Sequence, residues 1–272
     1  MRRAAVRAAP VTMDALQVAA GALTGFVVGM TGVGGGALMT PILLLGFGTA
    51  PLVAVGTDLW FAAVTKLAVS GLHMRQRLID WPVVRRLWMG SLPASAVTLI
   101  WMAGRQANDG GVVLVKLAIA LAVCLTAAGL LAEAPLRALG PRRTATEPAS
   151  SGWTTTATVA AGAVLGFLVT LTSVGAGALG VVMLVRLYPR LTPQRLVATD
   201  IAHAIPLALC AGAGHLALSG IDLALLRDLL AGSIPAALVG TAISSRLPHA
   251  ILRTALGAVL LVIGLTMLGG AM

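Results

Sequence analysis

The residues with the clearest chemical potential are ionisable side chains that stand inside otherwise apolar stretches, namely Asp58, Lys66, Asp200 and His203. Such a side chain is a candidate for an ion or proton pathway, because a charge held away from water is costly. We predict that Asp58 and Asp200 carry a coupled proton, since a low dielectric favours the neutral carboxyl group until it meets water. The alternative for both is a cap at the start of a helix.

Lys66 and His203 extend these two candidates for proton coupling. Lys66 follows Asp58 by two helical turns, so the pair could neutralise each other or Lys66 could face an anion. His203 stands one turn from Asp200, where an imidazole could relay protons. The competing interpretation of His203 is an interior histidine whose hydrogen bonds are satisfied. Ala208 stands where the second half would repeat Lys66, so any role of the lysine is not duplicated.

Two runs of small residues, 31–36 and 172–177, interrupt apolar stretches at equivalent places in the two halves of the chain. Glycine is unfavourable inside a helix, so these runs predict breaks. A helix that starts inside a membrane offers unpaired N–H groups and the positive end of its dipole to an anion. The predicted substrate-binding residues are Thr31, Gly34, Gly35, Gly36, Thr57, Thr172, Gly175, Gly177 and Thr199. The alternative is that the glycines only permit close helix packing.

The composition identifies the class of protein that must position these residues. Of the 272 residues 58% are hydrophobic and only 10% are charged, which excludes an ordinary soluble protein. Several apolar stretches approach the roughly 20 residues that a membrane-spanning helix needs. Alternating strand patterns are missing from the sequence, so we predict an all-α polytopic membrane protein rather than a barrel.

The net charge of +10 does not indicate a nucleic-acid partner. Nearly all arginines stand in short segments between apolar stretches, which is the positive-inside pattern of a membrane protein. Cys124 and Cys210 both lie within apolar segments, and two isolated cysteines support neither a disulfide framework nor a metal site. We therefore expect no cofactor and no metal, with membrane lipid as the surroundings.

The chain contains ten apolar segments, five in each half: 14–30, 37–47, 52–74, 83–104 and 112–131, then 156–171, 178–187, 196–218, 223–244 and 251–268. Segments 37–47 and 178–187 are too short to cross a membrane alone. Each is either half of a broken span or one arm of a re-entrant hairpin, which is tolerated only where protein or water covers the open backbone.

The second half repeats the first. Beyond the short segments a single insertion shifts the register, and a constant spacing then matches Thr57-Asp58 with Thr199-Asp200, His73 with His215, Asp80 with Asp222, and Gly90-Ser91 with Gly232-Ser233. These matches indicate an internal duplication. The predicted units are an N-terminal membrane repeat (14–132), a polar linker (133–152) and a C-terminal membrane repeat (153–270). We expect His73 and His215 to be interfacial.

The arginines also bear on the orientation of the repeats. If the short segments form hairpins without a net crossing, the repeats are inverted and segments 75–86, 137–143, 186–195 and 246–253 all face the cytoplasm. If each pair crosses once, the repeats are parallel and the arginines divide between both sides. The arginine count favours inverted repeats, although the arginines of the N-terminal tail would then lie outside.

Four motifs resemble the TauE/SafE sulfite-exporter family: Gly-Met-Thr-Gly-Val-Gly-Gly-Gly-Ala-Leu-Met-Thr-Pro at 29–41, Val-Gly-Thr-Asp-Leu at 55–59, Ala-Thr-Asp-Ile-Ala-His at 198–203 and Gly-Ser-Ile-Pro at 232–235. The resemblance covers about 20–264 and implies an inner-membrane carrier of sulfite, sulfonates or related organosulfur anions that works without ATP. Family members often have serine or asparagine at the positions of Asp58 and Asp200. This departure favours proton coupling over direct anion coordination by the two carboxylates.

These observations favour a secondary transporter of small anions, with export as the expected direction, over an enzyme. The rival is an intramembrane hydrolase with Ser173 as nucleophile and His203 as base. Duplication argues against it, because an enzyme needs one site and the counterpart of Ser173 is Gly32. A carrier of a different organic anion and assembly as a homo-oligomer both stay open.

Overall fold

The computed structural model describes residues 13–31, 36–75, 77–104, 110–139, 152–175, 177–243 and 249–271, and all regular structure within them is helical. The helices are α1 (Ala15–Thr31), α2 (Gly36–Pro41), the π-helical turn η1 (Ile42–Gly46), α3 (Pro51–Arg75), α4 (Trp81–Ala103), α5 (Gly110–Leu139), α6 (Gly152–Thr172), α7 (Ala178–Leu187), α8 (Pro193–Leu218), α9 (Leu223–Ile243) and α10 (His249–Ala271). The predicted all-α class is confirmed.

Five stretches of the described helices are long and apolar enough to cross a membrane: Pro51–Ser70, Val115–Ala132, Gly152–Thr172, Pro193–Leu218 and Leu223–Ile243. Shorter apolar helices accompany them at Ala15–Thr31, Ala37–Gly46, Ala178–Leu187 and Thr254–Gly269. The chain is therefore a multi-pass membrane protein.

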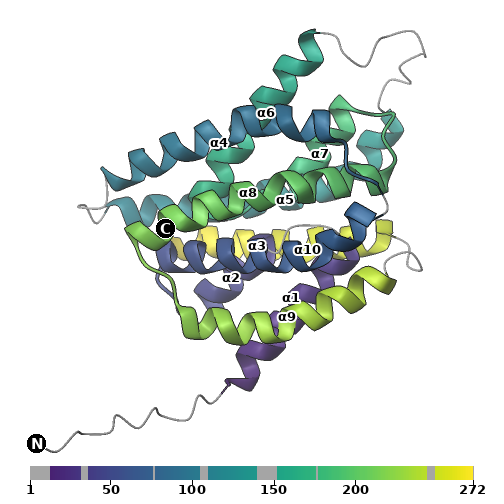
Figure 1. The fold of residues 1–272 in the computed structure, drawn as a ribbon. Helices are drawn as coiled ribbons and strands as arrows, with labels where there is room; N and C mark the ends of the chain where they lie inside the picture. Colours follow the sequence, from purple (N-terminus) through teal and green to yellow (C-terminus); the bar gives the residue numbers. More distant parts are fainter. Residues whose placement is uncertain are drawn as a thin grey trace, which may run out of the picture.

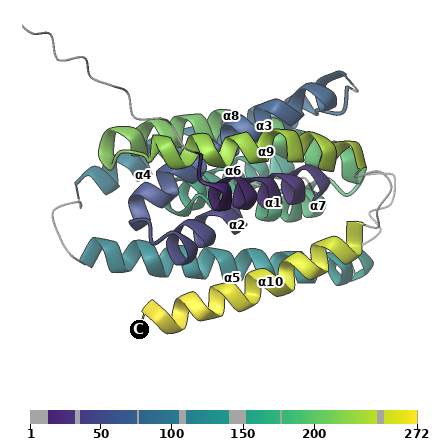
Figure 2. The same ribbon diagram turned by 90° about the horizontal axis from the view of Figure 1, so that it is seen from below.

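The two halves of the chain interlock. The most extensive helix contacts join α1 to α9, α4 to α6, α5 to α10 and α3 to α8, and each of these pairs takes one helix from each half. In Figure 1, α4 and α6 lie along the top, α8 and α3 through the middle, and α9 with α1 along the bottom. Figure 2 shows α5 and α10 side by side along one edge. The core is thus shared between the halves.

Glycines permit the closest of these contacts at equivalent places in the two halves. A Cβ atom added to Gly25 of α1 would stand 2.6 Å from the Cα atom of Ser233 in α9. A Cβ atom added to Gly166 of α6 would stand 2.7 Å from the Cα atom of Ser91 in α4. Both distances are far below a normal contact, so the backbones touch only because these residues have no side chain.

The directions of α1 and α3 distinguish between a broken span and a hairpin. Gly21 and Gly25 of α1 meet Leu229 and Ser233 of α9 in the same order, so α1 and α9 are parallel. Helix α3 is also parallel to α9. Thr57 in α3 accepts a hydrogen bond from the backbone N–H of Asp222 just before α9, and further along both helices the hydroxyl of Thr65 lies 2.9 Å from that of Ser233. The chain must therefore turn back between α1 and α3. This geometry is a helical hairpin, with α2 and η1 as its returning arm, and it is consistent with the re-entrant alternative.

The second half repeats this hairpin with α7 as the returning arm. Helices α6 and α8 both run parallel to α4, as shown by the following contacts: Gly162 with Leu87, Gly166 with Ser91, Thr199 with Asp80, and His203 with Ser91. The equivalent helices α3 and α8 run antiparallel, since Gly56 meets His215 whereas Gly212 meets Trp60. Antiparallel equivalent helices are consistent with inverted repeats.

The basic ends of several helices gather at one end of the molecule. Val83 and Leu87 of α4 pack with Leu184 of α7 and Leu196 of α8, so the start of α4 lies together with segment 186–195. In Figure 1 the end of α9 and the start of α10 lie at this same, right-hand end. This placement agrees with the orientation that the arginine count favours.

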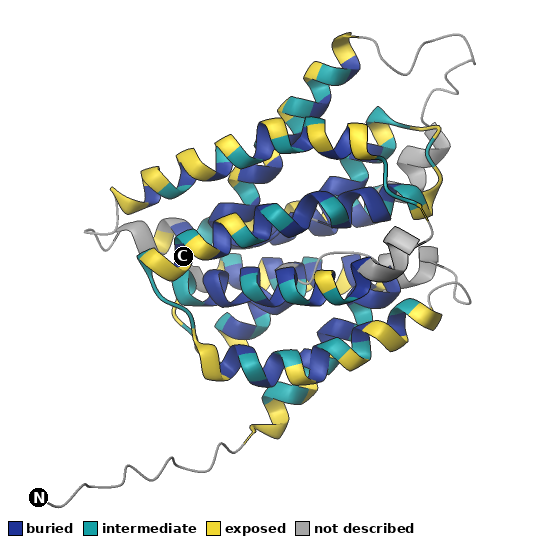
Figure 3. Ribbon diagram, viewed as in Figure 1, coloured by how far each residue is buried: buried dark blue, intermediate teal, exposed yellow. Residues whose placement is uncertain are grey.

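Helices α3 and α8 form the centre of the bundle. Of their most apolar stretches 67% and 56% are buried inside the protein, against 44% for α5, α6 and α9. Figure 3 shows the same contrast, with dark blue along the middle helices and yellow on the outer faces at the top and bottom. Polar residues on α3 and α8 are therefore those most shielded from lipid.

The clearest departures from the predicted segments are at the end of α5 and within segment 37–47. Helix α5 continues past the predicted end at Leu131 to Leu139, so the polar linker that we predicted to begin at 133 begins with helix. The predicted segment 37–47 is not one α-helix, because α2 gives way after Pro41 to the π-helical turn η1. Proline has no N–H group to donate to the preceding turn, which accounts for a change of helix type at this position.

Candidate functional site

The first buried carboxylate belongs to Asp58 in the second turn of α3, which is fully buried. The hydroxyl of Thr40 in α2 donates a hydrogen bond to Asp58 Oδ2. Ser173, just after α6, also interacts with this carboxylate, yet Ser173 Oγ and Asp58 Oδ1 both lack a partner within hydrogen-bond distance. Asp58 therefore lies where the hairpins of both halves approach each other, with hydrogen-bonding capacity left over.

The second carboxylate, that of Asp200, occupies the equivalent position in α8 and is also fully buried. It lies against Gly180 in the first turn of α7, where an added Cβ atom would stand 2.9 Å from Asp200 Cγ and still closer to Oδ1. The Gly180 N–H donates to the carbonyl oxygen of Gly175 at 3.1 Å. The absence of a side chain at Gly180 is what leaves room for the carboxylate.

Lys66 of α3 lies within the electrostatic range of both carboxylates. Its side chain is 2% exposed, and its ammonium group is close enough to interact electrostatically with both Asp58 and Asp200. His203 of α8 is fully buried and within the electrostatic range of Lys66. The structure thus brings together all the residues predicted for proton coupling, from both halves of the chain.

His203 is held in place by α4. Its Nε2 atom lies 2.9 Å from the hydroxyl of Ser91, and its carbonyl oxygen accepts a hydrogen bond of 3.1 Å from the indole N–H of Trp88. The rival hydrolase would need His203 next to Ser173. The imidazole is hydrogen-bonded to Ser91 instead, and Ser173 Oγ has no hydrogen-bond partner, so the nucleophile and base pair is not formed.

The glycines of the second break are required by the backbone. Gly175 has φ 127° and Gly177 has φ 117°, conformations that side chains rarely permit, and Ser173 before them has φ 58°. Replacing either glycine would strain the turn whether or not an anion binds there. In the first break Gly36 begins α2, whereas Gly34 and Gly35 lie outside the described residues.

Thr31 and Thr172 close the helices that precede the two breaks. The hydroxyl of Thr31 donates to the carbonyl oxygen of Val27 and that of Thr172 to the carbonyl oxygen of Leu168, each at 2.7 Å. These equivalent bonds run to the preceding turn, a common role for threonine within a helix. The hydroxyl oxygen of Thr172 also accepts the N–H of Val174 at 3.1 Å, so this side chain shapes the turn itself.

Thr57 and Thr199 tie the two halves together. Thr57 Oγ1 accepts the backbone N–H of Asp222 at 3.1 Å, and Thr199 Oγ1 accepts the backbone N–H of Asp80 at 3.0 Å. Each bond joins the central helix of one half to the start of a helix in the other. Thr57 and Thr199, which directly precede Asp58 and Asp200, therefore stabilise the contact between the two halves.

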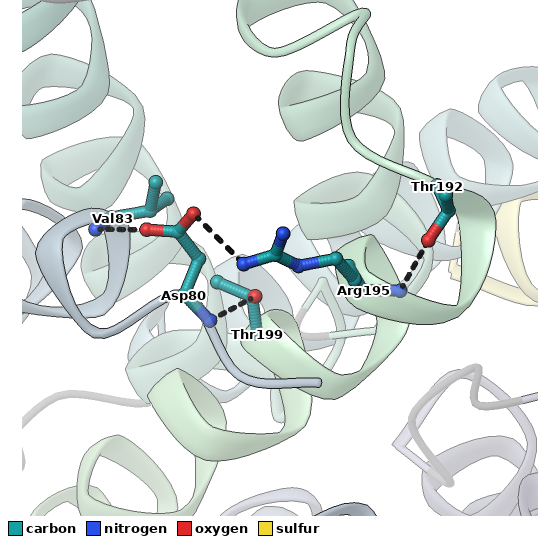
Figure 4. A network of polar contacts seen from close by, with 5 residues as sticks. All are labelled: Asp80, Val83, Thr192, Arg195 and Thr199. Carbon is teal, nitrogen blue, oxygen red and sulfur yellow. Dashed lines mark hydrogen bonds and ion pairs between the residues drawn. The ribbon is translucent and has the colours of Figure 1, made fainter. Parts of the chain in front are cut away.

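Figure 4 shows the polar network around Asp80 at one of these two junctions. Asp80 caps α4 by accepting the N–H of Val83 at 3.3 Å, and its other oxygen lies 3.6 Å from the guanidinium of Arg195. Thr192 caps α8 by accepting the N–H of Arg195 at 3.4 Å. At the other junction Asp222 likewise accepts the N–H of Leu225 at 2.9 Å. Capping by aspartate is therefore duplicated, because Asp80 caps the start of α4 and Asp222 caps the start of α9.

Two features of the site were missed by the sequence analysis. Thr40 was read only as part of a motif, although a hydroxyl one turn into a short intramembrane segment is itself a polar signal. His215 was expected to be interfacial, and this was wrong. It is fully buried, and its Nε2 atom lies 2.8 Å from the carbonyl oxygen of Thr170, so it closes the last turn of α6.

Comparisons with known proteins identify one family and one similar membrane transporter protein. The sequence model of the family described as "Sulfite exporter TauE/SafE" matches residues 17–267. The chain is also 34% identical over 253 residues to "Probable membrane transporter protein YjnA" of Bacillus subtilis (strain 168), which covers 91% of this chain and 97% of that protein. No solved structure matches this chain. Within the described ranges, no cluster of histidine, cysteine and acidic residues could hold a metal ion.

Proposed function

Because the chain belongs to the sulfite exporter TauE/SafE family, we propose that it is a secondary transporter of small sulfur-containing anions such as sulfite or organosulfonates. A membrane transporter of this family type agrees with the name of the Bacillus subtilis relative. The proposal adds the substrate class, export across a bacterial inner membrane, and coupling to protons.

One observation carries the coupling part of the proposal. Two carboxylates at equivalent positions of the duplicated halves, Asp58 and Asp200, are fully buried beside the two helical hairpins and share the charge of Lys66. Buried ionisable groups between helices of a membrane protein mark proton and ion pathways. Duplicated segments with discontinuous helices that meet inside the membrane are also the usual setting of a transporter's binding site.

The mechanism follows from charge. A low dielectric favours the neutral carboxyl group, and an anion entering the same site favours it further, because two negative charges close together repel. Anion and proton binding are therefore linked. When the site opens to water on the other side, the carboxyl group is hydrated, and the proton leaves together with the anion. Export is then driven by the concentration gradient of the anion, which carries the proton outward with it.

The test is flux in proteoliposomes made with the full chain. Labelled sulfite, sulfoacetate and sulfate are supplied with and without a pH gradient, to the unaltered protein and to the Asp58→Asn, Asp200→Asn double variant. We expect the double variant to exchange the anion but to lose gradient-driven uptake, since asparagine imitates a carboxyl group that never releases its proton. Unchanged gradient-driven transport by the double variant would leave both carboxylates as structural groups.

A further inference from the structure

We propose that Lys66 is the residue to which the transported anion binds, and that the site accepts a monoanion together with one proton while rejecting dianions. This inference rests on the proposed transport of small anions and adds the binding residue, the charge of the substrate and the proton count. It begins with the charges that the bundle buries.

Among the residues whose burial the structure describes, Lys66 is the only buried lysine or arginine. It is also the one charged member of the cluster that the duplication does not repeat, since Ala208 stands at the corresponding position. Both neighbouring carboxylates interact with it. An anion that enters the interior of this bundle therefore finds a single ammonium group, within the electrostatic range of Asp58 and Asp200.

The charged groups of this cluster act on one another. The charged group that acts on Asp58 is Lys66, those that act on Lys66 are the two carboxylates, and the one that acts on His203 is Lys66. The packed elements supply neutral polar groups, namely Thr40 of α2, Ser173 before α7 and Ser91 of α4. His203 is counted as neutral, because a second buried cation beside Lys66 would be repelled.

The charge balance then limits what can bind. Before an anion enters, Lys66 offsets the effect of the low dielectric and both carboxylates are ionised, so the site carries a net charge of −1. A bound monoanion would make it −2. Buried charge without compensation is costly, so the anion displaces one carboxylate from Lys66 and that carboxylate takes up a proton from the solvent. The net charge returns to −1. A dianion would need a second proton, which would remove the last carboxylate charge.

Unused hydrogen-bonding groups fit the same class of ligand. Ser173 Oγ and Asp58 Oδ1 are both buried and without a hydrogen-bond partner, and the two side chains interact. A serine hydroxyl and a protonated carboxyl oxygen are both donors, as the ammonium group is. Hydrogen sulfite and simple alkanesulfonates such as methanesulfonate are monoanions whose sulfur-bound oxygens accept such bonds, whereas sulfate and sulfoacetate are dianions at neutral pH.

The experiment measures binding as well as transport. Methanesulfonate and sulfate are titrated into the purified full chain in weakly buffered solution, with a pH indicator to count protons. We expect methanesulfonate to bind with uptake of about one proton and sulfate to bind at least about a hundredfold more weakly, as for an ion that leaves a buried charge uncompensated. Equal binding of sulfate, or binding without proton uptake, would overturn the monoanion rule.

Variants of Lys66 test its role directly. Lys66→Met alone leaves two buried carboxylates without the cation that acts on both and could fail to fold, so it is paired with Lys66→Met, Asp200→Asn, which keeps the net charge of the site at −1. We expect this double variant to fold and to lose methanesulfonate affinity by at least about a hundredfold. Lys116→Met, at an exposed lysine of α5, is the matched control and should bind normally.

The outcomes separate this inference from the proposed function. Normal methanesulfonate binding by the Lys66→Met, Asp200→Asn variant would overturn the role of Lys66 and leave transport of anions untouched. An unaltered protein that neither binds nor transports sulfite or any sulfonate would overturn the proposed function, and this inference with it.

Discussion

Asp58 and Asp200 occupy the same position of a duplicated sequence, and their surroundings differ. Both are fully buried, and both follow a threonine that accepts a backbone N–H from the opposite half, at 3.1 and 3.0 Å. The Asp58 carboxylate accepts a hydrogen bond from the Thr40 hydroxyl, whereas the Asp200 carboxylate lies against the backbone of Gly180, which has no side chain. The sequence explains this contrast, because Val181 corresponds to Thr40, and Met39 to Gly180, when the two halves are aligned at their glycine-rich breaks.

The difference separates two kinds of residue. Those that hold the helices together are duplicated, such as the glycines at helix crossings and the capping aspartates. Those that surround the carboxylates are not, as Thr40, Lys66 and His203 have no equivalents. We call the duplicated glycines at helix crossings and the capping aspartates the frame. Both halves keep the frame because they need it to bury the same helices, whereas a single site inside it has one copy of its chemical groups.

The largest effect is expected where the frame has no room. Gly25→Val and Gly166→Val should each lower the stability by about 3 kcal/mol or more, since the new side chain meets the backbone of Ser233 or Ser91 and cannot be accommodated by a rotamer change. Thermal denaturation of the protein in detergent measures this. The control is Gly269→Val, where nothing lies within 4 Å. A large loss in only one of the two variants would break the equivalence of the halves.

Gly180→Ala tests the part of the site that is not duplicated. The added methyl group must displace the Asp200 carboxylate, at a strain of about 1–3 kcal/mol, so the initial rate of anion flux should fall by about tenfold or more. Gly46→Ala is the matched control at the other hairpin, since its nearest neighbour would be 3.9 Å away. Equal flux in the two variants would show that the contact with Gly180 does not matter.

Thr57→Val and Thr199→Val should have smaller and equal effects. Each removes the acceptor of a partly buried backbone N–H and should cost about 1–2 kcal/mol of stability. Both variants are compared by thermal denaturation and by anion affinity. A loss of affinity without a loss of stability would instead support the predicted role of these threonines in substrate binding.

The smallest effect is expected for Arg195→Gln. The ion pair with Asp80 spans 3.6 Å and its arginine side chain is 43% exposed, so its removal should cost no more than about 1 kcal/mol. Val53 corresponds to Arg195 in the first half, so the other junction holds without such a pair. Thermal denaturation at low and high salt measures the contribution. A loss of stability greater than that of Thr199→Val would show that the Arg195–Asp80 ion pair, which only one half has, contributes more to helix packing than expected.

Local features of the sequence determined the helices and the repeat. Apolar length and the scarcity of charge predict membrane helices, because every backbone polar group must be satisfied inside the segment. The regular spacing between the two halves is visible without a structure, and so are Asp58, Lys66, Asp200 and His203 as charges in apolar surroundings. The extension of α5 to Leu139 was not visible, since the composition of that stretch resembles a linker.

Only the tertiary structure decided which residues meet. Hydropathy is a property of neighbours along the chain, whereas the bond from Thr40 to Asp58, the contact of Gly180 with Asp200 and the sharing of Lys66 join different elements. The same limit explains the wrong expectation for His215: a position near the end of an apolar segment resembles the interface, but α8 lies at the centre of the bundle and the side chain reaches α6. Burial in a bundle of many helices depends on which helices surround a residue, and that is settled by packing rather than by sequence position.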